Sequence, residues 1–333
     1  MQFDVAQAAL ADAGLGIDDI DGVVVAANDQ MDGRAISIMA ASGSVGGVGR
    51  DILSTPSAAE HAFIMGVLRI ASGQYRTQLV VSWSPTEASS LPEVERISAD
   101  PYFHRRLPLD DLSAFALQAS ALGAKAPHAH EIARSMAPPD ASFRRWPLTT
   151  SMTPPPQTAA VALVLCSEAF AAGRAGANAW IKGMDWATEA SFLGDRDLAS
   201  APALERAAAR AYEEAGVTRP RGEIDVIEAS DPTPYQLLLS LEAMRLSPRD
   251  AWAHDMRSGA PDLGGKPLVN PSGGSRALNG VYCNGLIRIA EAALQVRGAA
   301  GGRQAADVRI AVAQAASGPA MQYQTVVVFG RDP

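Results

Sequence analysis

Cysteine is scarce in this chain, with only two, Cys166 and Cys283, among 333 residues. Because they lie far apart in the sequence, they form neither a disulfide framework nor the close spacing of a metal site. Long apolar runs are also missing, since no stretch approaches the roughly 18 residues that a membrane span needs. The first ten residues lack the charged and apolar regions of a secretory signal. We therefore expect a cytoplasmic protein that has no membrane span and binds no metal.

A surplus of basic residues is missing as well. The 28 Lys and Arg are outnumbered by 36 Asp and Glu, which gives a formal net charge of −8. This balance argues against a nucleic acid partner, because binding to a phosphate backbone relies on positive charge. The 47% of apolar and 19% of charged residues are typical of a globular protein with a buried core. The length predicts two core-forming units or one large α/β fold.

Two segments far apart in the chain look like copies of one unit. DAGLGIDDIDGVVVA (residues 12–26) and EAGVTRPRGEIDVIEA (residues 214–229) each end a helical pattern at a glycine and lead through Ile-Asp into an apolar strand. A further helix and strand are predicted in each half: 57–72 and 78–82, then 284–296 and 308–313. The strands are continuous apolar runs, which is typical of a sheet covered by helices on both faces. The pattern predicts a duplicated α/β architecture.

The two halves are expected to meet near residue 170. The N-terminal half covers residues 1–170 and the C-terminal half covers residues 171–333. Within the first, residues from about 85 to 153 form an insertion rich in Pro, Arg, His and aromatic side chains. Insertions into a rigid α/β core commonly cap a site or build an interface, so we predict a cap here.

The segment Val-Asn-Pro-Ser-Gly-Gly at residues 269–274, followed by Asn279, Gly280 and a helix from residue 285, resembles the C-terminal catalytic loop of thiolases. Further phrases agree with this family in order, and they resemble its sterol-carrier and lipid-transfer branch: DAGLGIDDIDGVVVA, IASGQYRTQLVVSW, TAAVALVLCSEAFA and IEASDPTPYQLLLSLEAM. The resemblance implies a thiolase-like five-layer αβαβα fold. It also implies a homodimer that extends one sheet across a twofold axis.

The departures from the thiolase pattern concern its catalytic residues. Thiolases place a nucleophilic Cys at the start of the first-half helix, and this position falls near Pro56 in Ser-Thr-Pro-Ser (54–57). The family's activating His after the Gly-Gly pair is replaced by Asn279-Gly280-Val281, and the second Cys is absent from residues 314–318. Thiolysis through an acyl-enzyme therefore has neither its nucleophile nor its base.

One group of related enzymes fits these departures: the cysteine-free, thiolase-like aldolases of steroid side-chain degradation. The resemblance implies cleavage of a carbon–carbon bond in a β-hydroxyacyl-CoA, with tyrosines in the cleft and a small zinc-ribbon/OB-fold partner protein. The tyrosines at the matching loops are Tyr235 and Tyr282. A retro-aldol reaction needs a base for the β-hydroxyl and a donor for the enolate oxygen. A phenol has a pKa of about 10, which must be lowered before it acts as the base.

The substrate-binding candidates surround these tyrosines. Asn270, Gly273 and Gly274 predict a tight turn whose amides can approach a ligand, and the alternative is a purely structural turn. Asn279 can donate to the thioester oxygen. Ser57, at the start of the first-half helix, and Asp231, in Asp-Pro-Thr-Pro-Tyr (231–235), complete the set. In the duplicated fold we expect these segments to converge on one cleft that binds acyl-CoA, with no cofactor beyond the CoA of the substrate.

Alternatives remain for each of these roles. Tyr235 and Tyr282 can serve as packing residues, and His61 can pack or cap its helix. The chain can also be a catalytically silent subunit that binds acyl-CoA or scaffolds a partner. A third possibility is an acyltransferase that uses Ser54, Ser57 or Cys283, for which the sequence offers no evident base.

Overall fold

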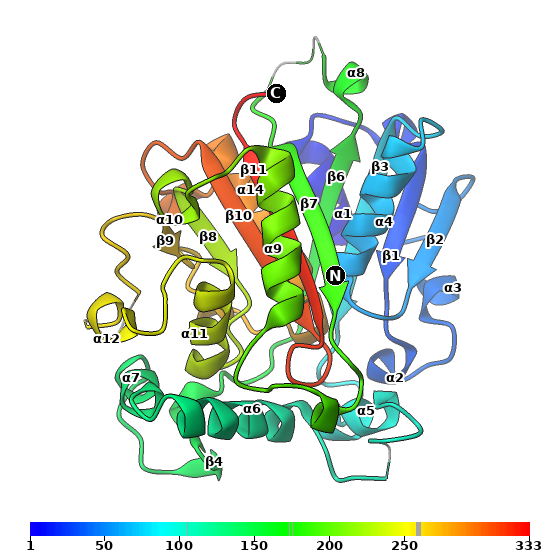
Figure 1. Ribbon diagram of the computed structural model, residues 1–333. Helices are drawn as coiled ribbons and strands as arrows, with labels where there is room; N and C mark the ends of the chain where they lie inside the picture. Colours follow the sequence, from blue (N-terminus) through cyan, green and yellow to red (C-terminus); the bar gives the residue numbers. More distant parts are fainter. Residues whose placement is uncertain (105, 173, 175, 258–260) are drawn as a thin grey trace. The chain divides into compact units, whose positions relative to one another are not determined.

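The computed structural model describes residues 1–104, 106–172, 174, 176–257 and 261–333. Two compact units are distinguished by their internal contacts. The first unit contains residues 1–94, 156–178 and 280–290, and the second unit contains residues 95–155, 179–279 and 291–333. Helices and strands of both units are labelled in Figure 1.

The first unit is built on a four-stranded sheet in the order β2-β1-β3-β6. Its strands are β1 (Gly22–Ala26), β2 (Asp51–Thr55), β3 (Thr77–Ser84) and β6 (Ala159–Cys166). β2 and β3 pair with β1 in parallel, and β6 pairs antiparallel with β3. The three parallel strands therefore end at the same edge of the sheet, the edge at which Thr55 lies.

Two helices cover this sheet, α1 (Gln2–Asp12) and α4 (Ala59–Ala71). Leu10 of α1 belongs to the same buried hydrophobic cluster as Val23 and Val25. Gly66 of α4 lies against the sheet so closely that an added Cβ would be 3.0 Å from the side chain of Val80. Val80 is the register partner of Val24, so its side chain points to the face opposite Val23 and Val25. The helices thus lie on opposite faces, as continuous apolar strands predict.

The second unit is built on a five-stranded sheet in the order β7-β11-β10-β8-β9. Its strands are β7 (Trp180–Thr188), β8 (Val226–Ala229), β9 (Leu268–Val269), β10 (Ile310–Ser317) and β11 (Tyr323–Gly330). β8, β9 and β10 are parallel, while β11 and β7 run antiparallel to their neighbours. Helix α9 (Pro202–Ala215) lies across β7 and β11 (Figure 1). Their contact is so close that an added Cβ at Gly183 would be 2.1 Å from the carbonyl oxygen of Ala211.

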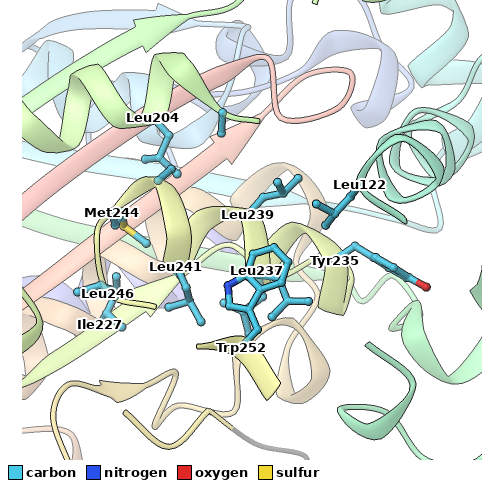
Figure 2. Packing of buried hydrophobic residues seen from close by; sticks show 14 of the residues in the cluster. Leu122, Leu204, Ile227, Tyr235, Leu237, Leu239, Leu241, Met244, Leu246 and Trp252 are labelled. Atoms are coloured by element: carbon cyan, nitrogen blue, oxygen red, sulfur yellow. The ribbon is translucent and has the colours of Figure 1, made fainter. Parts of the chain in front are cut away.

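The other large part of the second unit is helical. It contains α6 (Asp111–Lys125), α7 (Ala129–Ser135), α11 (Pro234–Ala243) and α12 (Trp252–Asp255). These helices share one core, in which Trp252, Leu122 and Leu239 are almost completely buried (Figure 2). Residues 95–155, most of the predicted insertion, belong to this unit because α6 and α7 pack against α11.

The remaining elements are short apart from α14. The helices are α2 (Asp29–Asp32), α3 (Ser37–Ala41), α5 (Leu91–Ser98), α8 (Glu168–Ala171), α10 (Pro220–Glu223), α13 (Gly274–Ala277) and α14 (Asn284–Arg297). Five 3-10 helices are present in the described residues: η1 (Ile17–Asp19), η2 (Thr150–Met152), η3 (Leu193–Asp195), η4 (Val281–Cys283) and η5 (Gly301–Arg303). β4 (Phe143–Arg145) and β5 (Leu148–Thr149) form a two-stranded sheet. Among the described residues, no helix has the length and apolar character to cross a bilayer.

The predicted duplication is visible in the two sheets. β2-β1-β3-β6 and β9-β8-β10-β11 have the same order, with three parallel strands followed by an antiparallel one. The predicted helices and strands occur within a few residues of their expected bounds. β2, β7, β9 and β11 were not predicted. β7 lies at the edge of its sheet, and most of its positions are exposed or only partly buried, so it lacks the continuous apolar run used to identify the other strands.

Candidate functional site

The predicted site residues of the first unit gather at the start of α4. β2 ends at Thr55, and α4 begins after Ala58. Ala58 has an extended backbone, and its methyl side chain offers the helix no capping hydrogen bond. The hydroxyl of Tyr282 in η4 donates to the backbone carbonyl of Thr55 at 3.1 Å. The Oγ of Ser57 lies 2.9 Å from Thr55 Oγ1 and 2.7 Å from Nδ1 of His61. Tyr282 and Ser57 therefore both contact the Thr55–Ser57 loop.

Tyr282 is held in its protonated form. Burial raises the pKa of this phenol well above its usual value, and the nearby charge of Glu60, the Cys283 thiol and Asp29 raise it further. A group with a raised pKa keeps its proton at neutral pH. Tyr282 is therefore suited to donate a hydrogen bond, and the lowered pKa needed for a phenolate base is not found.

Cys283 is a buried thiol beside Tyr282. Its Sγ lies 3.3 Å from the Oγ of Ser84 and 3.5 Å from that of Ser82. Burial raises the pKa of Cys283 to about 11, so almost none of it is thiolate at neutral pH. The other cysteine, Cys166, is exposed at the end of β6. Burial raises the pKa of Cys166 more than the nearby charge of Arg174 lowers it, so neither cysteine has the lowered pKa of an activated nucleophile.

The predicted residues of the second unit gather where β8 and β9 end. Asn270 follows β9 with a left-handed backbone, φ +48°. Its Oδ1 accepts from the backbone N–H of Ala229 at 2.7 Å, and its Nδ2 donates to the carbonyl of Ala229 at 3.1 Å. Both ends of the amide are thus used to join the loop to the end of β8, so Asn270 positions the loop.

Two carboxylates hold the rest of this loop. Glu228, fully buried in β8, accepts from the backbone N–H of Ser272 at 3.0 Å and from its Oγ at 2.7 Å. Asp231 accepts from the backbone N–H of Ser275 at 2.7 Å. Gly274 must be glycine here, because its φ is +61° and an added Cβ would lie 2.2 Å from Oδ2 of Asp231. The structure therefore brings Asp231 together with Asn270, Gly273 and Gly274, which precede and begin α13.

Asn279 and Tyr235 have partners within the second unit. Asn279 donates from Nδ2 to the carbonyl of Pro154 at 2.8 Å, so a hydrogen bond to a thioester would share or replace this contact. Tyr235 is fully buried, and its hydroxyl lies 2.8 Å from Nδ1 of His130. Figure 2 shows this hydroxyl pointing away from Trp252 and the leucines of the core. Burial raises the pKa of Tyr235 to about 12, so this phenol is also protonated at neutral pH.

Sequence reasoning brought forward eight site residues, of which Ser57 and Tyr282 lie in the first unit and the other six in the second. The predicted convergence of all of them on one cleft stays a prediction. Two further residues were missed. The sequence predicts packing or capping for His61, and no helix periodicity signals its contact with Ser57, because Ser57 precedes α4 and only the fold brings its Oγ to 2.7 Å from Nδ1. Glu228 was read only as part of a strand, although a carboxylate in an otherwise apolar strand is itself a signal.

Comparisons with known proteins agree with the resemblance derived from the motifs. A family model described as "Thiolase C-terminal domain-like" matches residues 186–331. Sterol carrier protein 2 from Homo sapiens is 37% identical over 109 residues, a segment that covers 32% of this chain and 20% of that protein. An acetyl-CoA acetyltransferase from Methanothermobacter thermautotrophicus is 29% identical over 147 residues, which cover 44% of this chain and 38% of that protein.

Two solved structures share the fold over almost the whole chain. A structure described as "Ltp2-ChsH2(DUF35) aldolase" matches 99% of this chain and 93% of its own, with a TM-score of 0.78 and 18% sequence identity. A monomeric SCP2-thiolase-like protein type 1 from Mycobacterium smegmatis matches 100% of this chain and 74% of its own, with a TM-score of 0.66 and 17% identity. The thiolase-like α/β fold and the resemblance to the sterol-carrier and lipid-transfer branch of thiolases are thereby confirmed.

Proposed function

We propose that this thiolase-like chain is a retro-aldol carbon–carbon lyase that acts on a β-hydroxyacyl-CoA, for example one with a steroid side chain. The observation that carries the proposal is the first-unit site. At the start of α4, Ser57 stands near the position where thiolases have their nucleophilic cysteine, and a protonated phenol, Tyr282, contacts the same loop. A donor without a thiolate suits a retro-aldol step, which forms no acyl-enzyme. The fold shared with a structure described as an aldolase supports the proposal.

In the proposed reaction the β-hydroxyl loses its proton and becomes the carbonyl of a released ketone or aldehyde. The Cα–Cβ bond breaks, and its electron pair moves into the thioester, which becomes an enolate. In this proposal Tyr282 exchanges its hydrogen bond to the Thr55 carbonyl for one to the substrate, and Tyr235 exchanges its contact with His130 in the same way. Each phenol then donates to developing negative charge, the task for which a raised phenol pKa is suitable. Protonation of Cα then completes the shortened acyl-CoA.

The substrate-binding roles belong to the same proposal. The loop at Gly273 and Gly274 and the side chain of Asn279 contact the thioester or the CoA. The N–H of Gly273 donates to the carbonyl of Asn270 at 2.9 Å and that of Gly274 to Ser272 Oγ at 3.2 Å, so a bond from either amide to the substrate would share or replace these contacts. Asp231 and Asn270 keep the loop in place through Ser275 and Ala229. Ser57 contacts the β-hydroxyl end of the substrate. No cofactor is required beyond the CoA that the substrate carries.

The partner proteins are proposals of the same kind. One solved structure with the same fold is described as "Ltp2-ChsH2(DUF35) aldolase", a title that names two proteins. By analogy we propose that this chain forms a heteromeric complex with a small zinc-ribbon/OB-fold protein in the cytoplasm. A homodimer that extends one sheet across a twofold axis is proposed from the resemblance to thiolases.

Acyl transfer is the second candidate, and one contact favours it. The 2.7 Å between Ser57 Oγ and His61 Nδ1 supplies the base that the sequence did not reveal for a serine nucleophile. This reaction would leave an acyl group on Ser57, whereas the retro-aldol reaction leaves the protein unmodified. A silent acyl-CoA-binding subunit would bind the substrate and release neither product.

The direct test compares Tyr282→Phe with the wild type in the presence of the zinc-ribbon partner and a β-hydroxyacyl-CoA. We expect turnover to fall by about 10² to 10⁴, the usual value of a positioned donor, while CoA affinity and unfolding stay nearly unchanged. The matched control is Tyr102→Phe, because Tyr102 is 89% exposed. Equal turnover of Tyr282→Phe and Tyr102→Phe would remove Tyr282 from the mechanism.

A further inference from the structure

We propose that His61 is the general base of this site and that it removes the β-hydroxyl proton through the Ser57 hydroxyl. The inference rests on the proposed carbon–carbon cleavage and names the group that this reaction still lacks. In this inference Ser57 contacts the substrate, and His61 is hydrogen-bonded to Ser57 on the side away from the substrate.

The need for such a base follows from the neighbouring groups. The phenol of Tyr282 and the thiol of Cys283 both have raised pKa values, so neither is a good proton acceptor at neutral pH. Asp29 already accepts backbone hydrogen bonds from Ser37 at 2.8 Å and Ile36 at 3.1 Å. An imidazole has an ordinary pKa of about 6.5, which suits a base that works near neutral pH.

The geometry provides a path for the proton. Ser57 and His61 are four residues apart at the start of α4, and the 2.7 Å between Oγ and Nδ1 is short enough for direct transfer. Thr55 Oγ1, 2.9 Å from Ser57 Oγ, holds the serine hydroxyl from the other side. Ser57 is exposed and His61 is partly exposed, so a substrate can reach the hydroxyl. The carbonyl of Thr55 accepts the Tyr282 hydroxyl, so the donor and the proton path contact the same loop.

Glu60 gives an independent sign that a ligand belongs at this turn. Its side chain is only 1% exposed, and within the described part of the chain its Oε1 has no hydrogen-bond partner. Its charge acts on the Tyr282 hydroxyl, which places the carboxylate near the donor. A buried acceptor without a partner is unfavourable, and a hydroxyl group of a bound substrate would satisfy it. Because Glu60 is itself a possible proton acceptor, Glu60→Gln is one of the variants in the test.

The step is balanced without any further reactant. As Ser57 Oγ takes the proton of the β-hydroxyl, its own proton passes to Nδ1 of His61, and the β-carbon becomes a carbonyl. The Cα–Cβ bond breaks, and its electron pair forms the thioester enolate. His61 then returns the proton through Ser57 to Cα, which restores both side chains and yields the shortened acyl-CoA.

The titratable groups near His61 lie on α4 itself, on the elements packed against it and on α2. The elements packed against α4 are β1, β2, β3, β6 and η4. Of their titratable side chains, Tyr282 and Cys283 come from η4 and keep their protons at neutral pH. Asp51 of β2 is paired with Arg69 near the other end of α4, at 3.1 Å, and Cys166 lies at that same edge of the sheet. Glu60, on α4 itself, and Asp29 of α2 are the nearby carboxylates.

The test is the pH dependence of kcat/KM for cleavage of a β-hydroxyacyl-CoA, with the zinc-ribbon partner present. For the wild type we expect kcat/KM to increase with pH through an acidic limb and then to level off. His61→Gln should lose about 10² to 10⁴ in rate together with this acidic limb. His61→Asn is the second variant, since its amide can still contact Ser57 but takes up no proton. His128→Gln is the matched control, because His128 is exposed and belongs to the second unit.

The outcomes separate this inference from the proposed function. Cleavage by the wild type, with full activity and an unchanged limb in His61→Gln or His61→Asn, would overturn the role of His61 alone. Loss of the limb in Glu60→Gln but not in the His61 variants would assign the base to Glu60 instead. An acyl group on Ser57, detected by intact mass, would make Ser57 a nucleophile and contradict the relay. Absence of cleavage by the wild type at every pH would overturn the proposed function and, with it, this inference.

Discussion

Replacing Gly274 with alanine tests how the second-unit loop is held together. Gly274 has φ +61°, and an added Cβ would lie 2.2 Å from Oδ2 of Asp231 and 2.9 Å from Nδ2 of Asn270. Asp231 must then move away from Ser275, whose backbone N–H donates a hydrogen bond to its Oδ1 at 2.7 Å. The matched control is Gly216→Ala in the same unit, because Gly216 has φ +70° and no atom within 4 Å of an added Cβ.

The expected difference follows from these contacts. A left-handed backbone at a non-glycine residue costs about 1–2 kcal/mol, and both variants have this cost. Gly274→Ala should lose a further 1.5–3 kcal/mol, approximately, as the charged hydrogen bond to Ser275 breaks. Urea unfolding should therefore show a loss of about 2.5–5 kcal/mol for Gly274→Ala against about 1–2 kcal/mol for Gly216→Ala. Equal losses in the two variants would refute the assigned role of Asp231 and the packing of this loop.

Two further predictions concern the buried thiol and the second phenol. Iodoacetamide should label Cys166 faster than Cys283 in the folded protein, because Cys166 is exposed, although burial raises its pKa, whereas Cys283 is buried with a pKa of about 11. Peptide mass mapping checks this order, and faster labelling of Cys283 would contradict it. Tyr235→Phe should lower the turnover of cleavage by about 10² to 10⁴ if the pair of Tyr235 and His130 supplies a proton donor. Unchanged turnover with a loss of about 1 kcal/mol in unfolding would instead assign this hydroxyl to packing.

The duplicated fold could be predicted from the sequence because local sequence patterns mark the helix ends and the buried strands of both copies. The second copy ends its helix at Gly216, whose φ of +70° suits a residue that closes a helix. The apolar runs of β1 and β8 are buried on both faces, and this kind of strand is read most directly from sequence. β7 was missed because most positions of this edge strand are exposed or only partly buried, so it has no continuous apolar run.

The site was predicted less completely, because its chemistry depends on contacts between distant or differently oriented side chains. Asn270 was correctly placed in the turn, but its amide joins the end of β8, a contact that no local pattern reveals. The direction of the tyrosine pKa shifts depends on burial, which is a property of the folded chain. His61 was set aside as a packing residue, and only the fold shows its Nδ1 facing Ser57.

The central claim is carbon–carbon cleavage without a cysteine nucleophile, and one measurement tests it most directly. The variant that carries both Cys166→Ala and Cys283→Ala is incubated with a β-hydroxyacyl-CoA and the zinc-ribbon partner, and the products and the intact protein mass are followed together. We predict a ketone or aldehyde and a shortened acyl-CoA in equal amounts, at a rate within a few-fold of the wild type, with no mass added to the protein. Loss of cleavage in this variant, release of free CoA in place of the carbonyl product, or an acyl group bound to the protein would contradict the proposed mechanism.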